Sequence, residues 1–318
     1  MNNLAITSSP HFRATQTTRV IMQDVLIALL PALLVSVWAF GLRALVMVAT
    51  CVAACMLSEY LYRRLMGLDQ TVTDLSAAVT GVLIAYNLPV GLPLWMAVIG
   101  SFTAIVIIKQ LFGGLGKNFA NPAIVARIVL LISFTSPMTV WLLPKNSVTP
   151  DVITGATPLG VLGSYEGSMA LAAAELPTRM EMFIGNIGGS LGETSAIALL
   201  LGGVYLVARK VITPTTPLAF IGTVFVLSWI LGADPVFQIL AGGVMLGAIF
   251  MATDYVTTPT TELGKLVFGI GCGLLTVIIR LYGAYPEGVS FAILIMNIVT
   301  PHIDRLTGIK AFGGAPAK

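Results

Sequence analysis

The sequence has little charge for its length. Only 10% of its 318 residues are charged, whereas 57% are hydrophobic. Soluble domains carry about 25% charged residues, so this composition excludes an ordinary soluble fold and predicts a membrane protein with several spans. The formal net charge of +3 comes from arginines and lysines in the loops, and we expect no nucleic-acid partner.

Histidine and cysteine are also scarce. The two histidines, His11 and His302, lie at opposite ends of the chain, and the three cysteines, Cys51, Cys55 and Cys272, lie in apolar runs. Cys51 and Cys55 share a helix face, which favours packed side chains over a metal site because no histidine is near. We therefore expect this chain alone to ligate no haem, zinc or iron–sulfur cluster.

Nucleotide-binding motifs are missing. The sequence has no Gly-x-Gly-x-x-Gly fingerprint at a strand–helix junction and no Walker sequence. Gly114 and Gly116 share a polar turn but belong to no βαβ unit. We expect the chain neither to bind NAD nor to hydrolyse ATP.

Long apolar runs separated by polar turns predict an all-α polytopic membrane protein with about ten transmembrane helices. The first run begins near Met22, and without a small-residue cleavage site it is expected to be a retained span. The predicted spans cover approximately residues 24–41, 44–62, a short run ending at 87, 94–112, 123–143, 190–208, 218–231, 236–251, 263–281 and 289–299.

The two halves of the chain resemble each other. Residues 78–89 are similar to residues 243–259, and each segment is followed by a span, a glycine turn and another span. One segment starts on the inner side and the other on the outer side, which predicts two inverted repeats of about five helices each, with interrupted helices. The chain then divides into repeats at 1–142 and 186–318, joined by a loop at 143–185. A plain transporter would show the same pattern.

Loop charges predict the orientation of these spans, because positive residues concentrate in cytoplasmic loops. Both termini are then cytoplasmic, and the 143–185 loop is external. One side of the predicted topology collects most of the basic residues, namely Arg13, Arg19, Arg63, Arg64, Lys117, Arg209, Lys210, Arg305 and Lys310.

The 143–185 loop contains the sequence Asp151-Val152-Ile153-Thr154-Gly155-Ala156-Thr157, followed by Pro158. The small residues before Thr157 leave room for a bulky group to approach its hydroxyl. Pro158 disfavours helical geometry at Thr157, so we expect an extended backbone that holds the hydroxyl out on a loop. A surface turn with an idle threonine is the alternative.

This stretch resembles the Asp-x-x-(Ser/Thr)-Gly-Ala-Thr motif at which a flavin transferase esterifies FMN, through its phosphate, onto the last threonine. That linkage occurs in the flavin-carrying subunits of the Rnf complex and of the Na+-translocating NADH:quinone reductase, Nqr. The resemblance runs over nearly the whole chain, and it implies a covalent FMN at Thr157. The defined motif positions are all matched, by Asp151, Thr154, Gly155, Ala156 and Thr157.

The resemblance also implies a function. The chain would carry electrons between the FMN and its neighbours inside a ferredoxin:NAD+ oxidoreductase that pumps Na+ or H+ across a bacterial or archaeal cytoplasmic membrane. The implied partners are a second covalent-flavin subunit, iron–sulfur subunits and a flavin transferase for maturation; no complete catalytic activity is expected from this chain alone. Its length favours the Rnf D subunit over the longer Nqr B subunit. A solute channel or transporter without a redox cofactor, and a structural scaffold, are the alternatives.

A second polar cluster is expected on the cytoplasmic side, where Asn118 and Asn121 of the first half face Asp254 and Thr257 of the second. Polar groups at membrane depth need partners, and the edge of an isoalloxazine ring offers alternating donors and acceptors. In the resembling family a riboflavin lies on this side, and residues 116–122 match a segment that contacts it. Helix capping by the two asparagines is the alternative.

Ionisable residues within the spans are few, and each needs an explanation. We expect Arg127 to reach the cytoplasmic cluster, where a cation would favour negative charge on a flavin. Lys109, Lys265 and Arg280 are expected to extend to the interface.

Further polar residues lie at span ends. Asn87, Tyr282, Tyr285 and Glu287 are expected beside the external loop, either as membrane-belt residues or as a docking surface for a tethered flavin. The nearest candidates for an ion path are Glu59, Asp74 and Asp254, with charges at helix ends as the alternative.

Overall fold

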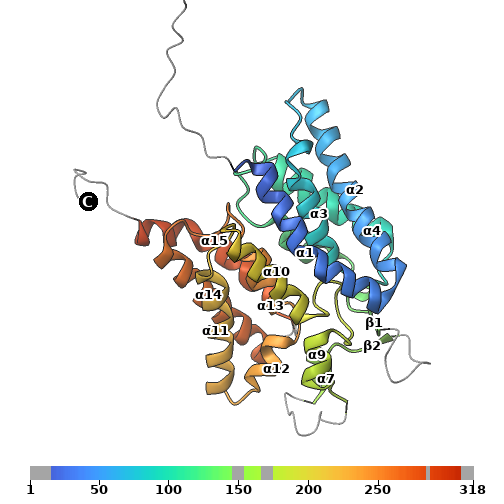
Figure 1. Cartoon of the computed structure of the whole chain (residues 1–318), viewed down its shortest axis with the longest axis vertical. Coiled ribbons are helices and arrows are strands. Elements are labelled where there is room, and N and C mark those ends of the chain that lie inside the picture. The colour runs from blue at the N-terminus through green and yellow to red at the C-terminus, as the bar shows by residue number, and fades with distance from the viewer. Residues whose placement is uncertain (1–15, 145–153, 166–174, 284–286, 309–318) are drawn as a thin grey trace, which may run out of the picture.

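The computed structural model describes residues 16–144, 154–165, 175–283 and 287–308, and this part of the chain is mostly helical (Figure 1). Four of its helices are long and apolar enough to cross a membrane, which confirms a membrane protein with several candidate spans. These four are α1 (Thr18–Phe40), α2 (Leu42–Leu65), α14 (Glu262–Tyr282) and α15 (Val289–Thr307).

Several other predicted spans are shorter or broken. The 123–143 run divides at Phe134, whose backbone leaves helical geometry (φ −130°, ψ 51°), and the 236–251 run breaks at Gly242 (φ 64°). The shorter helices are α3 (Ser76–Tyr86), α4 (Leu94–Phe102), α5 (Pro122–Ser133), α6 (Thr135–Met138), α10 (Ala196–Ala208), α11 (Thr215–Ile230), α12 (Pro235–Leu240) and α13 (Val244–Leu246).

Two segments have π-helical hydrogen bonding. The segment η2 (Thr103–Gln110) continues α4, and η3 (Gly247–Met251) continues α13. Such π-helical turns are rare and frequently lie at functional sites. The first half also contains a short 3-10 turn, η1 (Val72–Asp74).

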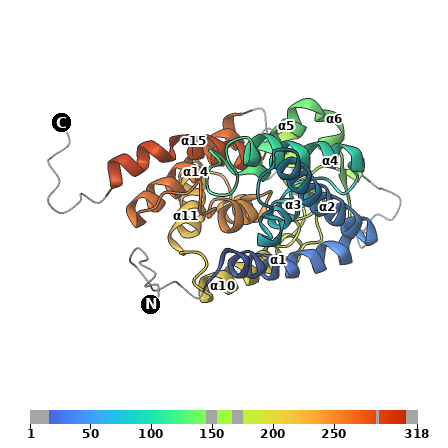
Figure 2. The ribbon, with the colours of Figure 1, turned by 90° about the horizontal axis from the view of Figure 1, so that it is seen from above.

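The helices form two groups that lie side by side, α1 to α5 in one and α10 to α15 in the other (Figure 1). Across the boundary α1 packs on α10, and α5 packs on α15 (Figure 2). Gly202 permits the first contact, because a Cβ there would overlap the carbonyl oxygen of Ala28. Corresponding neighbours recur in the two groups: α2 contacts α4 as α11 contacts α14, and α3 contacts α5 as η3 contacts α15.

The connection between the groups carries its own small structure at one end of the helices (Figure 1). The strand β1 (Trp141–Leu142) pairs antiparallel with β2 (Thr154–Gly155), and α7 (Pro158–Ser164) follows. The next helix is α9 (Arg179–Ile184). Its first residue, Arg179, forms an ion pair with Asp234 at the start of α12, with Nη2 2.6 Å from Oδ2. Beneath them lies a separate apolar cluster of Leu159, Leu162, Met182, Ile187, Phe237 and Ala241.

Candidate functional site

Thr157 begins α7. Its backbone is extended (φ −67°, ψ 158°), as Pro158 predicts, and its Oγ1 accepts a hydrogen bond from the backbone N–H of Gly160 at 3.1 Å. The expectation that the hydroxyl is held out on a loop was wrong, because Thr157 is only 8% exposed. The capping bond and the packing of α7 turn the residue inward.

Thr157 lines a cavity of about 230 Å³ between the loop and the helices. Its apolar wall comes from α5, α6, β1 and α15, and consists of Ile128, Leu131, Met138, Trp141 and Phe291. Its polar lining residues are Arg127, Thr139, Thr157, Glu287 and Ser290. A concave, mainly apolar site with a few placed polar groups is typical of a cofactor pocket.

The other motif residues lie close to Thr157. Ala156 also lines the cavity, and Thr154 and Gly155 form β2. Gly155 has little room, since an added Cβ would stand 3.0 Å from the Leu143 side chain. Asp151 lies outside the described residues. The structure thus brings the end of the motif to the cavity.

Arg127 is the centre of a buried polar network beside this cavity. Its Nη1 donates to Asn87 Oδ1 at 3.1 Å, to Ser290 Oγ at 3.1 Å and to Glu193 Oε1 at 3.3 Å. Its Nη2 forms an ion pair with Glu287. The expectation that Arg127 reaches the cytoplasmic cluster was wrong, because α5 directs the side chain towards the Thr157 cavity.

Two neighbours complete the network. Asn87 is buried and also donates to the carbonyl of Leu83 at 2.7 Å. The guanidinium of Arg280 donates to the carbonyl oxygens of Gln238 at 2.5 Å, Ala241 at 2.9 Å and Glu287 at 3.2 Å, so the expectation that it extends to the interface was wrong.

The two tyrosines expected on this side have different outcomes. Tyr282 is 75% exposed, as a belt residue would be, and Tyr285 lies outside the described residues. Sequence reasoning missed Glu193. The available signal was a single carboxylate in an otherwise small and apolar stretch before α10.

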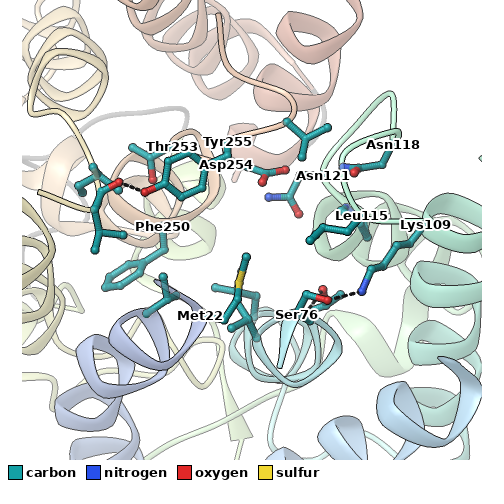
Figure 3. A pocket seen from close by; sticks show the side chains of 18 of the residues that line it. Met22, Ser76, Lys109, Leu115, Asn118, Asn121, Phe250, Thr253, Asp254 and Tyr255 are labelled. Carbon is teal, nitrogen blue, oxygen red and sulfur yellow. Dashed lines mark hydrogen bonds between the residues drawn. The ribbon is translucent and has the colours of Figure 1, made fainter. Parts of the chain in front are cut away.

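A second pocket, of about 100 Å³, brings Asn118, Asn121 and Asp254 together from the two groups of helices (Figure 3). Thr257 does not line it, but donates to Asp254 Oδ2 at 3.2 Å. Asn121 accepts from the backbone N–H of Ala123 at 3.0 Å, so it caps α5, and it also donates to the carbonyl of Met251 at 3.3 Å. The capping interpretation is confirmed for Asn121, which in addition bridges the two groups.

Lys109 lines the same pocket and is buried (Figure 3). Its Nζ lies 2.9 Å from Glu59 Oε2 and 2.6 Å from Ser76 Oγ, while Thr71 donates to Glu59 Oε1 at 2.6 Å. The expectation that Lys109 extends to the interface was therefore wrong, and Glu59 is a buried charge within α2 and not a charge at a helix end.

Two other charged residues behave as ordinary helix-end groups. Asp74 accepts from the backbone N–H of Ser76 at 2.8 Å, at the start of α3. Lys265 pairs with Glu262 at 2.8 Å in the first turns of α14, and both side chains reach solvent.

Comparison with known proteins identifies relatives over nearly the whole chain. The model of the NQR2, RnfD, RnfE family matches residues 5–313. The D subunit of the Na(+)-translocating ferredoxin:NAD(+) oxidoreductase complex of Acetobacterium woodii is 48% identical over 316 residues, covering 98% of this chain and 96% of the relative.

Two further relatives carry related names. The D subunit of the proton-translocating ferredoxin:NAD(+) oxidoreductase complex of Clostridium ljungdahlii is 43% identical over 322 residues, covering 98% of this chain and 97% of the relative. The D subunit of the ion-translocating oxidoreductase complex of Alcanivorax borkumensis is 37% identical over 333 residues, covering 98% and 97%. The relatives are named for different coupling ions, Na+ in one and the proton in another.

Proposed function

The chain belongs to the NQR2, RnfD, RnfE family, and from this membership we propose that it carries a covalent FMN on Thr157 within an Rnf-type complex. It is a multi-pass membrane subunit of an ion-translocating ferredoxin:NAD+ oxidoreductase complex. Its partners in this proposal are a second covalent-flavin subunit, iron–sulfur subunits and, during maturation, a flavin transferase. The motif ending at Thr157 is the observation that carries the flavin proposal, together with the cavity that Thr157 lines.

The residues around Thr157 fit a flavin. An isoalloxazine ring is flat and largely apolar, and Trp141 and Phe291 supply aromatic surfaces in the cavity wall. Its heteroatom edge needs polar partners, and Arg127 and Ser290 are present. The Thr157 oxygen would hold the phosphate as an ester. When bound, FMN supplies the capacity to accept and release electrons.

Flavin attachment can be tested on the wild-type chain. The protein would be expressed with and without a flavin transferase, separated by denaturing electrophoresis and examined for flavin fluorescence. We expect a fluorescent band only with the transferase, and a peptide containing Thr157 that is heavier by FMN minus water. A dark band, with the transferase active on a control protein, would refute the proposal and favour a solute channel or transporter.

We further propose that the second pocket, called the inner pocket below, binds a second, non-covalent flavin, riboflavin. Asn118, Asn121 and Asp254 would contact it, and Thr257 would orient the Asp254 carboxylate. This is supported by the amide and carboxylate groups that converge there from both groups of helices (Figure 3). These groups match the donors and acceptors at the edge of the ring.

Acid denaturation releases a non-covalent flavin from the protein and leaves a covalent one attached. The inner-pocket proposal therefore predicts that Asp254→Leu contains less acid-released flavin than the wild type but keeps the fluorescent band of the covalent FMN. The expected loss is about tenfold or more, since an apolar side chain would leave the ring edge unpaired. Flavin in the acid supernatant would be quantified against protein. Glu262→Gln, at an exposed acidic residue of α14, is the control. Unchanged release from Asp254→Leu would contradict this assignment.

The two groups of helices are proposed to be inverted repeats, 1–142 and 186–318, of about five spans each. The recurring neighbour pairs and the interrupted helices α3 and α13–η3 support this arrangement. We propose cytoplasmic termini and an external 143–185 loop in a cytoplasmic membrane. Ser164→Cys, at an exposed residue of α7, is then expected to react with an impermeant maleimide in intact cells. Reaction only after lysis would indicate the opposite orientation, with this loop on the cytoplasmic side.

A further inference from the structure

Among the residues that the structure describes, four charged side chains beside the Thr157 cavity have unequal access to it. Arg127 and Glu287 line the cavity, whereas Glu193 and Arg280 contact these two residues without being part of its lining. Within this described set, the two arginines and two carboxylates balance formally. Any charge added inside the cavity therefore acts most directly on one cation and one anion.

The fixed position of Arg127 has a clear structural cause. Asn87 comes from the first group of helices and Glu193 from the segment before α10, and both hold Nη1. Ser290 of α15 accepts from the same nitrogen. Arg127 and Glu193 are each 5% exposed, so water screens their charges little. The guanidinium therefore places a positive charge at the wall of the cavity.

We propose that Arg127 is the residue that sets the electron affinity of the redox group held at Thr157, and that Asn87 and Glu193 position it. This inference rests on the proposed flavin attachment. Uptake of one electron from a reduced donor adds one negative charge to the cavity, and the donor is oxidised by the same electron. No bond to Arg127 forms or breaks and no proton moves; its positive charge stabilises the added negative charge.

The size of the effect follows from Coulomb's law. Two unit charges about 10 Å apart, at the effective dielectric of a protein, change an equilibrium by about tenfold or somewhat more. Glu287 has the opposite sign and lines the same cavity. Neutralising Arg127 and neutralising Glu287 must therefore move the electron affinity in opposite directions. Structural damage to the network would give no such opposition, since the two residues form one ion pair.

The test is an anaerobic redox titration of the purified, flavin-carrying protein in the presence of mediators. Flavin absorbance is monitored at each potential. For Arg127→Gln the ratio of reduced to oxidised flavin at a fixed potential is expected to fall about tenfold, and for Glu287→Gln to rise by a similar factor. Arg43→Gln is the matched control, because Arg43 bonds the carbonyls of Val90 and Gly91 and does not line the cavity. We expect no change in this control.

Each outcome has one meaning. Shifts of the same sign in Arg127→Gln and Glu287→Gln, or no shift in either, would overturn the inference. Should Arg127→Gln fail to fold because Glu193 is left unpaired, the double variant Arg127→Gln/Glu193→Gln keeps the cluster balanced, and the ratio is still expected to fall. Gel fluorescence of every variant separates the two proposals. A dark wild-type band would contradict the proposed flavin attachment. A fluorescent band, with an unaltered ratio of reduced to oxidised flavin in Arg127→Gln, would contradict only the proposed role of Arg127.

Discussion

Thr157→Ala is expected to abolish covalent flavin completely, measured as the loss of band fluorescence after denaturing electrophoresis of protein expressed with the transferase. The reason is chemical, because the Thr157 oxygen becomes part of the phosphoester and alanine has no atom in its place. The substitution also removes the hydrogen bond from Gly160, which costs about 1 kcal/mol for a helix cap. That cost is too small to unfold the protein. An absence of fluorescence would therefore indicate that FMN is not attached, and not that the protein is unfolded.

The cavity offers a matched control for this variant. Thr139 lines the same cavity as Thr157 but lies outside the motif. Thr139→Ala is expected to keep full fluorescence, and both variants are expected to elute like the wild type on size-exclusion chromatography in detergent. Fluorescence retained in Thr157→Ala would show attachment at another residue. Fluorescence lost in Thr139→Ala would show that the cavity, and not the threonine hydroxyl, decides attachment.

The sequence predicted those features of the fold that depend on local pattern. The apolar runs near α1, α2, α14 and α15 are long enough to span a bilayer, and the structure has helices there. The extended backbone of Thr157 followed from Pro158 alone. Helix bounds were less accurate, because the breaks at Phe134 and Gly242 are backbone conformations that hydropathy does not report.

The partners of buried charges could not be predicted in the same way. Arg127 bonds Ser290, which is 163 residues away, and Glu193, which is 66 residues away, so its surroundings exist only after the two groups of helices pack. Lys109 similarly meets Glu59 from a different helix. A lone lysine in an apolar run avoids an unpaired buried charge in one of two ways, by extending to the interface or by forming an ion pair. Hydropathy does not distinguish between them.

The Lys109–Glu59 pair gives the largest stability prediction. Both side chains are buried, at 3% and 1% exposure, and they lie 2.9 Å apart. Lys109→Met would leave the Glu59 carboxylate without its cation, and breaking a buried ion pair in this way costs about 3–5 kcal/mol. We expect a large fall in the midpoint of thermal unfolding in detergent. Lys265→Met is the control, because Lys265 pairs with Glu262 near solvent at a similar distance of 2.8 Å and exposed pairs contribute about 1 kcal/mol or less.

A double variant separates loss of the pair from loss of packing. Glu59→Gln removes the carboxylate charge, and its amide oxygen can still accept from Thr71, which now donates to Glu59 at 2.6 Å. Lys109→Met/Glu59→Gln should therefore regain much of the stability that Lys109→Met loses, because neither group is then a buried, unpaired charge. Such a recovery would assign the cost to the unpaired carboxylate. If the double variant were as unstable as Lys109→Met, the lysine stem and its bond to Ser76 would be what stabilises this end of the inner pocket.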